Sequence, residues 1–242
     1  MSKFIVPYEI AFFWVGQDTI IPDYLVKSVR KVYNKNVKIS QLTDLKTPSV
    51  IDVDHIYRHD LPPEIMRARL ICYENYPYPN DKLVYFCDAD SLILKPLNFP
   101  DPKVNLYLVK RPDQYDNIIN HKFPENYPEF KAKRASEVMP IMFGAIAVRS
   151  GKAFFSSLNS TLNKLPKRFH RWYGDQYAIT LLMQNESIKF EDLRADKYLF
   201  CVGEDISNEQ IRKIKNLDIR MITFKGPDAK KCLPELYTKF FS

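Results

Sequence analysis

Hydrophobic residues form short apolar runs along the chain, and segments with helical spacing lie between these runs. The run Glu9–Gly16 is apolar and aromatic and closes with a glycine, which is typical of a buried strand that ends in a loop. From Pro22 onward, apolar residues recur at helical spacing with basic residues on the opposite face, which predicts a helix. Val37–Leu42 is predicted to form a second strand. A strand, a helix and a strand in this order form one βαβ unit, and such units build a mostly parallel sheet covered by helices.

The same alternation continues to the end of the chain. Residues 50–63 and 113–137 show no clear period and are predicted to be loops, the second with at most one short helix. The other segments predict strands in 82–90, 105–112, 197–203 and 219–227, helices in 63–77, 172–185 and 209–215, and a strand followed by a helix in 139–165. No internal repeat and no linker rich in glycine and serine is visible. We therefore expect a single α/β domain over residues 1–242 with a mostly parallel, Rossmann-like central sheet.

Composition limits the size of the core and the choice of partners. The 242 residues are 45% hydrophobic, which is enough to bury one sizeable core. The net charge of +7 favours nucleotide phosphates, nucleic acid or an acidic membrane surface, although a basic host proteome explains it equally well. Four scattered cysteines form no zinc-ligand pattern and are expected to be reduced. No segment reaches roughly 18 uninterrupted apolar residues and the start lacks a signal-peptide pattern, so we expect a cytoplasmic protein, with peripheral membrane contact left open.

Two aspartates, Asp88 and Asp90, follow the predicted strand that begins at Lys82. Ligands of open α/β sheets bind beyond the carboxyl ends of the strands. Residues i and i+2 of an extended segment face the same way, so both carboxylates are expected to reach one site. Paired carboxylates suit a hard cation such as Mg²⁺ or Mn²⁺ that also binds substrate phosphates. The alternative is a turn whose carboxylates accept backbone hydrogen bonds.

Four motifs, one of which contains Asp88 and Asp90, occur in a characteristic order along the chain. They are the helix and strand of Arg67–Leu97, the segment Phe12–Tyr33, "MFGAIAVRSGKAF" and "YGDQYAIT". In order and spacing they resemble glycosyltransferases with the GT-A fold, in particular the glycogenin and lipopolysaccharide galactosyltransferase group, over about residues 9–230. The resemblance implies a GT-A (nucleotide-diphospho-sugar transferase) fold and the transfer of a sugar from a nucleotide diphosphate.

The resemblance assigns a role to the segment around the two aspartates. Asp88, Ala89 and Asp90 match the family's metal and nucleotide-sugar motif, with the two carboxylates as metal ligands. Arg69, and Arg67 as a weaker match, correspond to the helix arginine that lies near the donor. Without the resemblance, either arginine is equally well explained as a charge on a helix surface.

A second pair of residues is implied to face the donor sugar. Asp175 and Gln176 match the acidic and amide pair of the family, where the carboxylate would orient the sugar or stabilise an oxocarbenium-like centre. The alternative for Asp175 is an N-terminal helix cap. We favour the catalytic interpretation because Gln176 adjoins it and Gly174 permits a close approach of the backbone.

The nucleotide and its diphosphate are implied to bind at two other places. Trp14 and Gly16 close the first strand where the family seats the nucleotide base, although a tryptophan there is more often a core residue. Gly226 and Lys230 lie where the glycogenin-like group has His-x-x-Gly-x-x-Lys, with a metal-binding histidine and a lysine that meets the diphosphate. Here Thr223 stands in place of the histidine, and Lys230 comes one residue late. The third protein ligand of a metal is therefore missing from the pattern.

These expectations predict a hexosyl- or pentosyltransferase that uses Mn²⁺ or Mg²⁺ and, if the resemblance holds, retains the anomeric configuration. A UDP-sugar is the first choice of donor. The acceptor hydroxyl would belong to a glycan, a lipid-linked sugar or a hydroxylated DNA base.

Two other classes of protein stay open. A nucleotidyltransferase also sets carboxylates beside a metal, but it usually carries a glycine-rich loop after its first strand, which this sequence lacks. A non-enzymatic nucleic-acid-binding protein on a degenerate transferase fold would use the basic clusters 131–134 and 164–171, the second with Phe169 and Trp172.

Overall fold

The structure is a computed structural model that describes residues 5–99, 101, 103–119, 127–185, 188–203, 206–224 and 226–242. The strands are β1 Glu9–Phe13, β2 Lys38–Asp44, β3 His55–His59, β4 Val84–Asp88, β5 Ser91–Ile93, β6 Leu106–Lys110, β7 Ile141–Val148, β8 Glu191–Asp192, β9 Phe200–Val202 and β10 Met221–Phe224. The α-helices are α1 Ile20–Tyr33, α2 Ile65–Glu74, α3 Ala135–Val138, α4 Lys152–Lys164, α5 Gly174–Asn185, α6 Ala195–Tyr198, α7 Asn208–Asn216, α8 Pro227–Lys231 and α9 Leu233–Phe241. Three 3₁₀ turns are η1 Asp113–Tyr115, η2 Pro128–Phe130 and η3 Lys167–His170.

The large sheet has the strand order β3-β2-β1-β4-β7-β6-β8. Strands β3, β2, β1 and β4 are parallel, as the βαβ pattern predicts. Strand β7 runs antiparallel to both β4 and β6, so β6 runs in the same direction as β4. The prediction of an α/β fold with a mostly parallel central sheet is confirmed. The carboxyl ends of β1, β4 and β6 therefore meet at one edge of the sheet.

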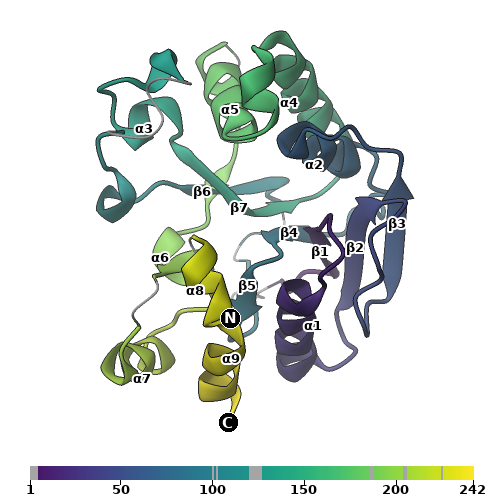
Figure 1. Cartoon of the computed structure of the whole chain (residues 1–242). Helices are drawn as coiled ribbons and strands as arrows, with labels where there is room; N and C mark the ends of the chain where they lie inside the picture. The colour runs from purple at the N-terminus through teal and green to yellow at the C-terminus, as the bar shows by residue number, and fades with distance from the viewer. Residues whose placement is uncertain are drawn as a thin grey trace.

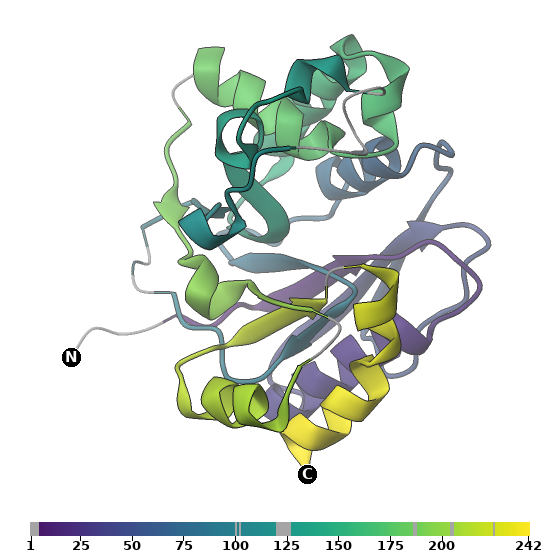
Figure 2. The same cartoon turned by 60° about the vertical axis from the view of Figure 1, so that its left-hand side comes forward.

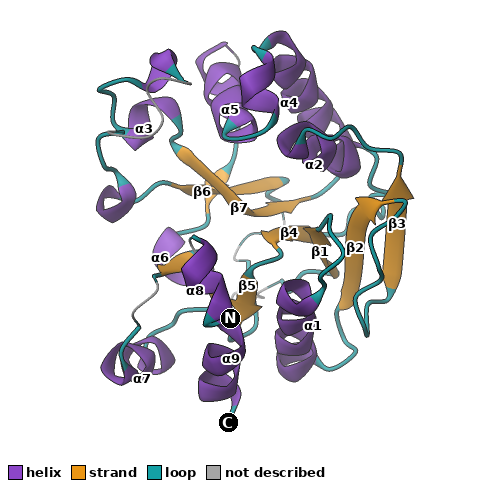
Figure 3. Cartoon of the chain, in the orientation of Figure 1, coloured by secondary structure: helices purple, strands orange, loops and turns teal. Residues whose placement is uncertain are grey.

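Helices cover both faces of this sheet (Figures 1 and 3). Helices α2, α4 and α5 pack on one face, and α1 and the small sheet lie on the other. After Glu9, β1 is apolar because its side chains enter two cores in turn: Ile10 and Phe12 join the core on the α1 side, and Ala11 joins the opposite core. In β4 the same alternation puts Phe86 on the α2 side.

A small sheet with the order β5-β10-β9 carries the C-terminal part of the chain. Its apolar side chains form a third core with α7 and α9, in which Leu92, Ile222 and Leu233 are fully buried. Figure 2 shows α8 and α9 beside α1. This arrangement brings α8 to the sheet edge at which β4 ends, where Lys230 pairs with Asp90.

One local prediction is wrong, and one helix was missed. Residues 50–63 were expected to be a loop, but His55–His59 form β3, which pairs in parallel with β2 at the sheet edge. Its polar, half-exposed side chains hid the strand, because an edge strand does not need the apolar alternation of a buried one. The sequence also gave no indication of α9. No helix in the described part of the chain is long and apolar enough to cross a membrane.

Candidate active site

Strand alternation places Asp88 on the α2 side of the sheet, in line with Phe86. There Arg69 of α2 meets two carboxylates. Its Nη1 lies 3.1 Å from Asp88 Oδ1, and its Nη2 forms an ion pair with Asp175 Oδ2 at the start of α5. The Asp175 side chain is 0% exposed, so Arg69 is its counter-ion inside the protein.

These residues border a pocket of about 250 Å³. The pocket is lined by Arg69, Asp88, Arg111, Met139, Met142, Phe143, Gly144, Tyr173 and Gln176. The guanidinium of Arg69 lies 5.3 Å from the centre of the Phe143 ring. The volume is below the ~300 Å³ of sites for drug-sized ligands, so the pocket has room for a small ligand or for part of a larger one.

Of the predicted pair on α5, only Gln176 reaches the pocket. Its Oε1 accepts a hydrogen bond of 3.1 Å from Nη2 of Arg111. The carboxylate of Asp175 lies behind Arg69 and accepts a hydrogen bond of 2.7 Å from the backbone N–H of Gln176. The predicted catalytic role of Asp175 stays a prediction, but its side chain does not line the pocket.

Arg111 is a pocket residue that the sequence analysis missed. It follows β6, whose carboxyl end lies at the same sheet edge as the end of β4. A charged residue at the carboxyl end of the strand predicted in 105–112 was the available signal, since ligands bind at that edge in α/β folds. No motif of the resembling family drew attention to it.

Asp90 has a different partner from Asp88. Its Oδ2 lies 2.7 Å from Nζ of Lys230 in α8. The chain bends at residues 89 and 90, after β4 has ended, so the strand alternation used in the prediction stops at Asp88. The two carboxylates are thus bound by cations from different helices, while Ala89 between them is buried.

Gly144 of β7 allows the Asp88 carboxylate to lie against the sheet. A Cβ at this position would stand 2.6 Å from Asp88 Oδ2 and 3.1 Å from Leu199 Cδ1. We expect Gly144→Ala to push the carboxylate aside and to lower the free energy of unfolding by about 1–2 kcal/mol, measured by urea denaturation. In an Asp88→Ala background the same change should cost clearly less, because the displaced group is gone. Equal costs in the two backgrounds would contradict this explanation.

Thr223, which stands where the resembling family has a metal-binding histidine, lies inside β10 and is 0% exposed. It pairs with Ser91 across the small sheet, and the hydroxyls of both residues have no hydrogen-bond partner among the described residues. No group of three or more His, Cys, Asp or Glu side chains in the described ranges is placed to hold a metal ion. The donor set at this edge is therefore the two carboxylates, which fit Mg²⁺ or Mn²⁺ only if phosphate and water complete the shell.

The residues predicted for the nucleotide lie around the same sheet edge. Trp14 packs against the core on the α1 side, and its Nε1 donates to the carbonyl oxygen of Asp18 at 2.9 Å. The N–H of Gly16 donates to Thr47 Oγ1 at 2.9 Å. Gly226 has a φ of 86°, which favours glycine, and precedes α8, the helix that carries Lys230. Base and phosphate binding by these residues stays a prediction.

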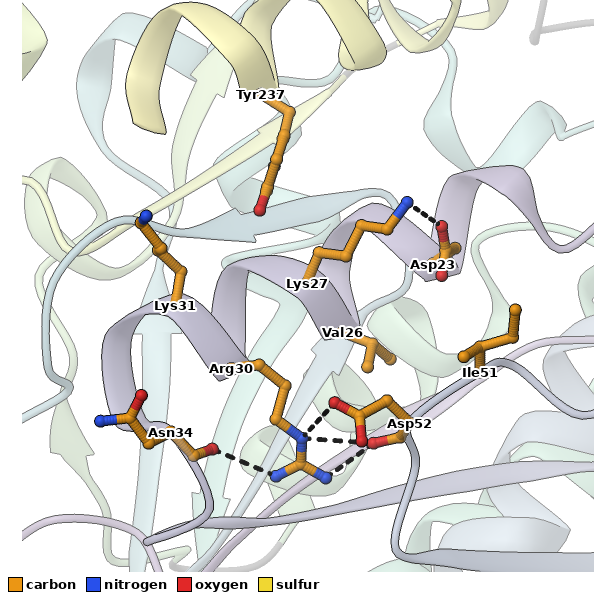
Figure 4. A pocket seen from close by; sticks show the side chains of 9 residues that line it. All are labelled: Asp23, Val26, Lys27, Arg30, Lys31, Asn34, Ile51, Asp52 and Tyr237. Carbon is orange, nitrogen blue, oxygen red and sulfur yellow. Dashed lines mark hydrogen bonds and ion pairs between the residues drawn. The ribbon is translucent and has the colours of Figure 1, made fainter. Parts of the chain in front are cut away.

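A larger cavity, of about 670 Å³, lies between α1, α9 and the loop at residues 51–52. Figure 4 shows two of its basic side chains paired within the cavity: Lys27 contacts Asp23 at 2.6 Å, and Arg30 contacts Asp52 at 3.2 Å. None of the described residues that line it belongs to the predicted site. Two of its three basic side chains, Lys27 and Arg30, are paired with carboxylates of the same cavity, so we do not place substrate binding there.

The nucleic-acid-binding alternative predicted stacking by two aromatic residues in the 164–171 cluster and beside it. Phe169 is 0% exposed and packs in the core, so it is not available to stack on a base. Trp172 is 62% exposed. In the 131–134 cluster, Arg134 is paired with Asp116 at 3.1 Å. One of the two expected aromatic contacts is therefore excluded.

No protein-family model matches the chain, and no curated protein matches it either. Among solved structures, the chain is similar to the crystal structure of a glycosyltransferase involved in the glycosylation of the major capsid of PBCV-1. The TM-score is 0.54 at 10% sequence identity, and the match covers 95% of this chain and 98% of that chain. At this identity the likeness concerns the fold: the mixed α/β architecture with its seven-stranded sheet is the Rossmann-like fold of a glycosyltransferase.

Proposed function

We propose that this protein is a glycosyltransferase that moves a sugar from a nucleotide diphosphate, with a UDP-sugar as the first choice, to a hydroxyl of an acceptor. The observation that carries the proposal is the pocket at the end of β4, where Asp88, Arg69 and Gln176 converge. It lies at the sheet edge where α/β folds bind ligands, on a fold shared with a solved glycosyltransferase. Fold likeness alone does not define chemistry, so the residues of this pocket are what support the proposed activity.

In the proposed reaction, the bond between the anomeric carbon and the diphosphate oxygen breaks, and its electron pair leaves with the diphosphate. The acceptor hydroxyl oxygen forms the new bond to the anomeric carbon, and its proton passes to the departing diphosphate. We propose retention of the anomeric configuration. Lys230 beside Asp90 would offset the negative charge that develops on the leaving group.

Asp88 and Asp90 would hold Mn²⁺ or Mg²⁺ together with the diphosphate, and the ion would stabilise negative charge on the leaving group. Each carboxylate already has a cationic partner, Arg69 for Asp88 and Lys230 for Asp90. Competition from these side chains should make the affinity of the protein for the ion alone weak. Added phosphate oxygens would then make the affinity stronger.

Gln176 and Arg69 are proposed to contact the donor sugar, because both line the pocket. Asp175 is instead proposed to be a positioning residue. Its buried carboxylate fixes the guanidinium of Arg69, which also contacts Asp88. Substitution of Asp175 should therefore act through Arg69 rather than through a lost contact with the sugar.

Thermal unfolding with ligands tests the donor assignment. We expect UDP with Mn²⁺ to raise the apparent stability by about 2.7 kcal/mol at a ligand concentration of 100 times Kd, and Mn²⁺ alone to have little effect. Asp90→Asn should lose most of the stabilisation by UDP with Mn²⁺. The matched control is Asp228→Asn, which removes an exposed carboxylate of α8 that pairs with Lys231, and it should behave like the wild type.

The corresponding activity measurement is the rate at which the protein hydrolyses each of a panel of UDP- and GDP-sugars in the presence of Mn²⁺. Equal turnover by the wild type and Asp90→Asn would contradict the role of Asp90. Salt-dependent retention on DNA without binding of any nucleotide sugar would instead favour the nucleic-acid-binding alternative.

A further inference from the structure

The guanidinium of Arg111 lines the pocket without an acidic partner. Its Nε donates to the carbonyl oxygen of Met139 at 2.8 Å, its Nη2 to Gln176 Oε1 at 3.1 Å, and its Nη1 lies 3.5 Å from the carbonyl oxygen of Tyr115. All three acceptors are neutral. No carboxylate of the described residues forms an ion pair with Arg111, and the nearby Asp116 is paired with Arg134.

Arg69, the other arginine of this pocket, forms ion pairs with two carboxylates, those of Asp88 and Asp175. Arg111 is different. Burial lowers the pKa of the Arg111 guanidinium by desolvation, and the nearby Cys201 and Asp116 offset this effect only in part. A guanidinium has five N–H donors, and the three contacts leave one N–H on each terminal nitrogen for a ligand.

We propose that Arg111 recognises a carboxylate on the donor sugar, so that the preferred donor is a UDP-linked uronic acid. This inference rests on the proposed function and specifies its substrate. A carboxylate accepts two parallel hydrogen bonds from a guanidinium and neutralises its charge, which a neutral hexose cannot do. A site built around such a pair rejects the analogue without the charged group, because the buried cation is then left unpaired.

The diphosphate is the other anion that could approach Arg111. Lys230, which pairs with Asp90, lines a separate cavity of about 420 Å³ with Asp18 and Tyr24. The pocket of Arg111 contains neither Lys230 nor any of these residues. A diphosphate bound beside Lys230 would thus leave the Arg111 pocket, which shares Asp88 with the proposed metal site, to the sugar.

Binding measurements with three ligands separate these sources of negative charge. Dissociation constants of UDP, UDP-glucose and UDP-glucuronic acid are measured by calorimetry with Mn²⁺ for the wild type and for Arg111→Gln. We expect the wild type to prefer UDP-glucuronic acid over UDP-glucose by about 10- to 100-fold, the range of one charge-assisted pair. Arg111→Gln should abolish the preference and leave the affinity for UDP unchanged.

Two further variants control for charge and folding. Lys110→Gln removes the neighbouring exposed cation of β6, whose Nζ lies 5.7 Å from the Phe190 ring, and should keep the wild-type preference. Arg111→Lys keeps the charge without the planar fork and should keep part of the preference. If Arg111→Gln does not fold, the wild-type ratio and Arg111→Lys still decide the question.

Three outcomes would overturn the inference. If the wild type binds UDP-glucose as tightly as UDP-glucuronic acid, Arg111 does not recognise a carboxylate on the donor sugar. A loss of UDP affinity in Arg111→Gln equal to the loss for UDP-glucuronic acid would assign Arg111 to the diphosphate, and both outcomes leave the proposed glycosyl transfer intact. Failure of every nucleotide to bind the wild type would overturn the proposed function and this inference together.

Discussion

Replacement of Arg69 by leucine is expected to lower the free energy of unfolding by about 3–5 kcal/mol. The reason is the Asp175 carboxylate, which is 0% exposed and has Arg69 as its ion-pair partner. Without Arg69, this buried charge has no counter-ion, and Asp88 loses its partner at the pocket. Urea denaturation followed by circular dichroism measures the change, with the midpoint and the slope fitted separately.

Arg67 provides the matched control, because it lies two residues earlier on α2 and its Nε has no hydrogen-bond partner among the described residues. Arg67→Leu should change the free energy of unfolding by less than about 1 kcal/mol. In the double variant Arg69→Leu/Asp175→Leu, at least half of the lost stability should return, since the unpaired carboxylate is removed as well. A loss for Arg69→Leu no larger than that of Arg67→Leu would contradict the assigned ion pair.

Replacement of Gly174 by alanine is expected to lower the free energy of unfolding by about 3 kcal/mol. The added Cβ would lie 2.0 Å from the carbonyl oxygen of Phe169 and 2.5 Å from Leu162 Cδ1. Backbone cannot move aside as a flexible side chain can, so η3 and the start of α5 would have to separate. The preceding residue, Tyr173, has a φ of 60° and leaves little freedom for adjustment.

Gly203→Ala is the control for this substitution. A Cβ at Gly203 would meet no heavy atom of the described residues within 4 Å. It should therefore change the stability by no more than about 0.5 kcal/mol. Because Gly174 precedes Asp175 and Gln176, Gly174→Ala should also weaken binding of the UDP-sugar more than binding of UDP. Equal stability of the two alanine variants would show that the close approach at Phe169 is absent in solution.

Much of the fold was predictable because its signals are local. The strands β1 and β4 are buried on both faces and therefore appear as apolar runs in the sequence. The helices α1 and α2 are buried on one face and therefore show apolar residues at helical spacing. Strand β3 was not predictable in this way. Its side chains are polar and half exposed, and the strand exists because β2 offers its backbone as a pairing partner.

In the candidate site, too, the features set by neighbouring residues were predictable and those set by long-range contacts were not. Alternation along β4 indicates on which face Asp88 lies, and a helix arginine at Arg69 was expected near the donor. The pairing of Asp90 with Lys230 joins residues that are far apart in the sequence, as does the contact between Arg111 and Gln176. Such pairings depend on how β6, α5 and α8 are brought to one sheet edge.

The sequence by itself determined the class of the fold, the strand that ends in two aspartates and the helix that presents Arg69. These features depend on hydrophobic periodicity and chain geometry over about ten neighbouring residues. Only the tertiary structure decided that Asp175 and Thr223 are buried, and that Arg111 lines the pocket without an ion pair to a carboxylate of the described residues. Burial and charge compensation are properties of residues that meet in space, and long-range packing of the elements, rather than any local pattern, sets which charges meet.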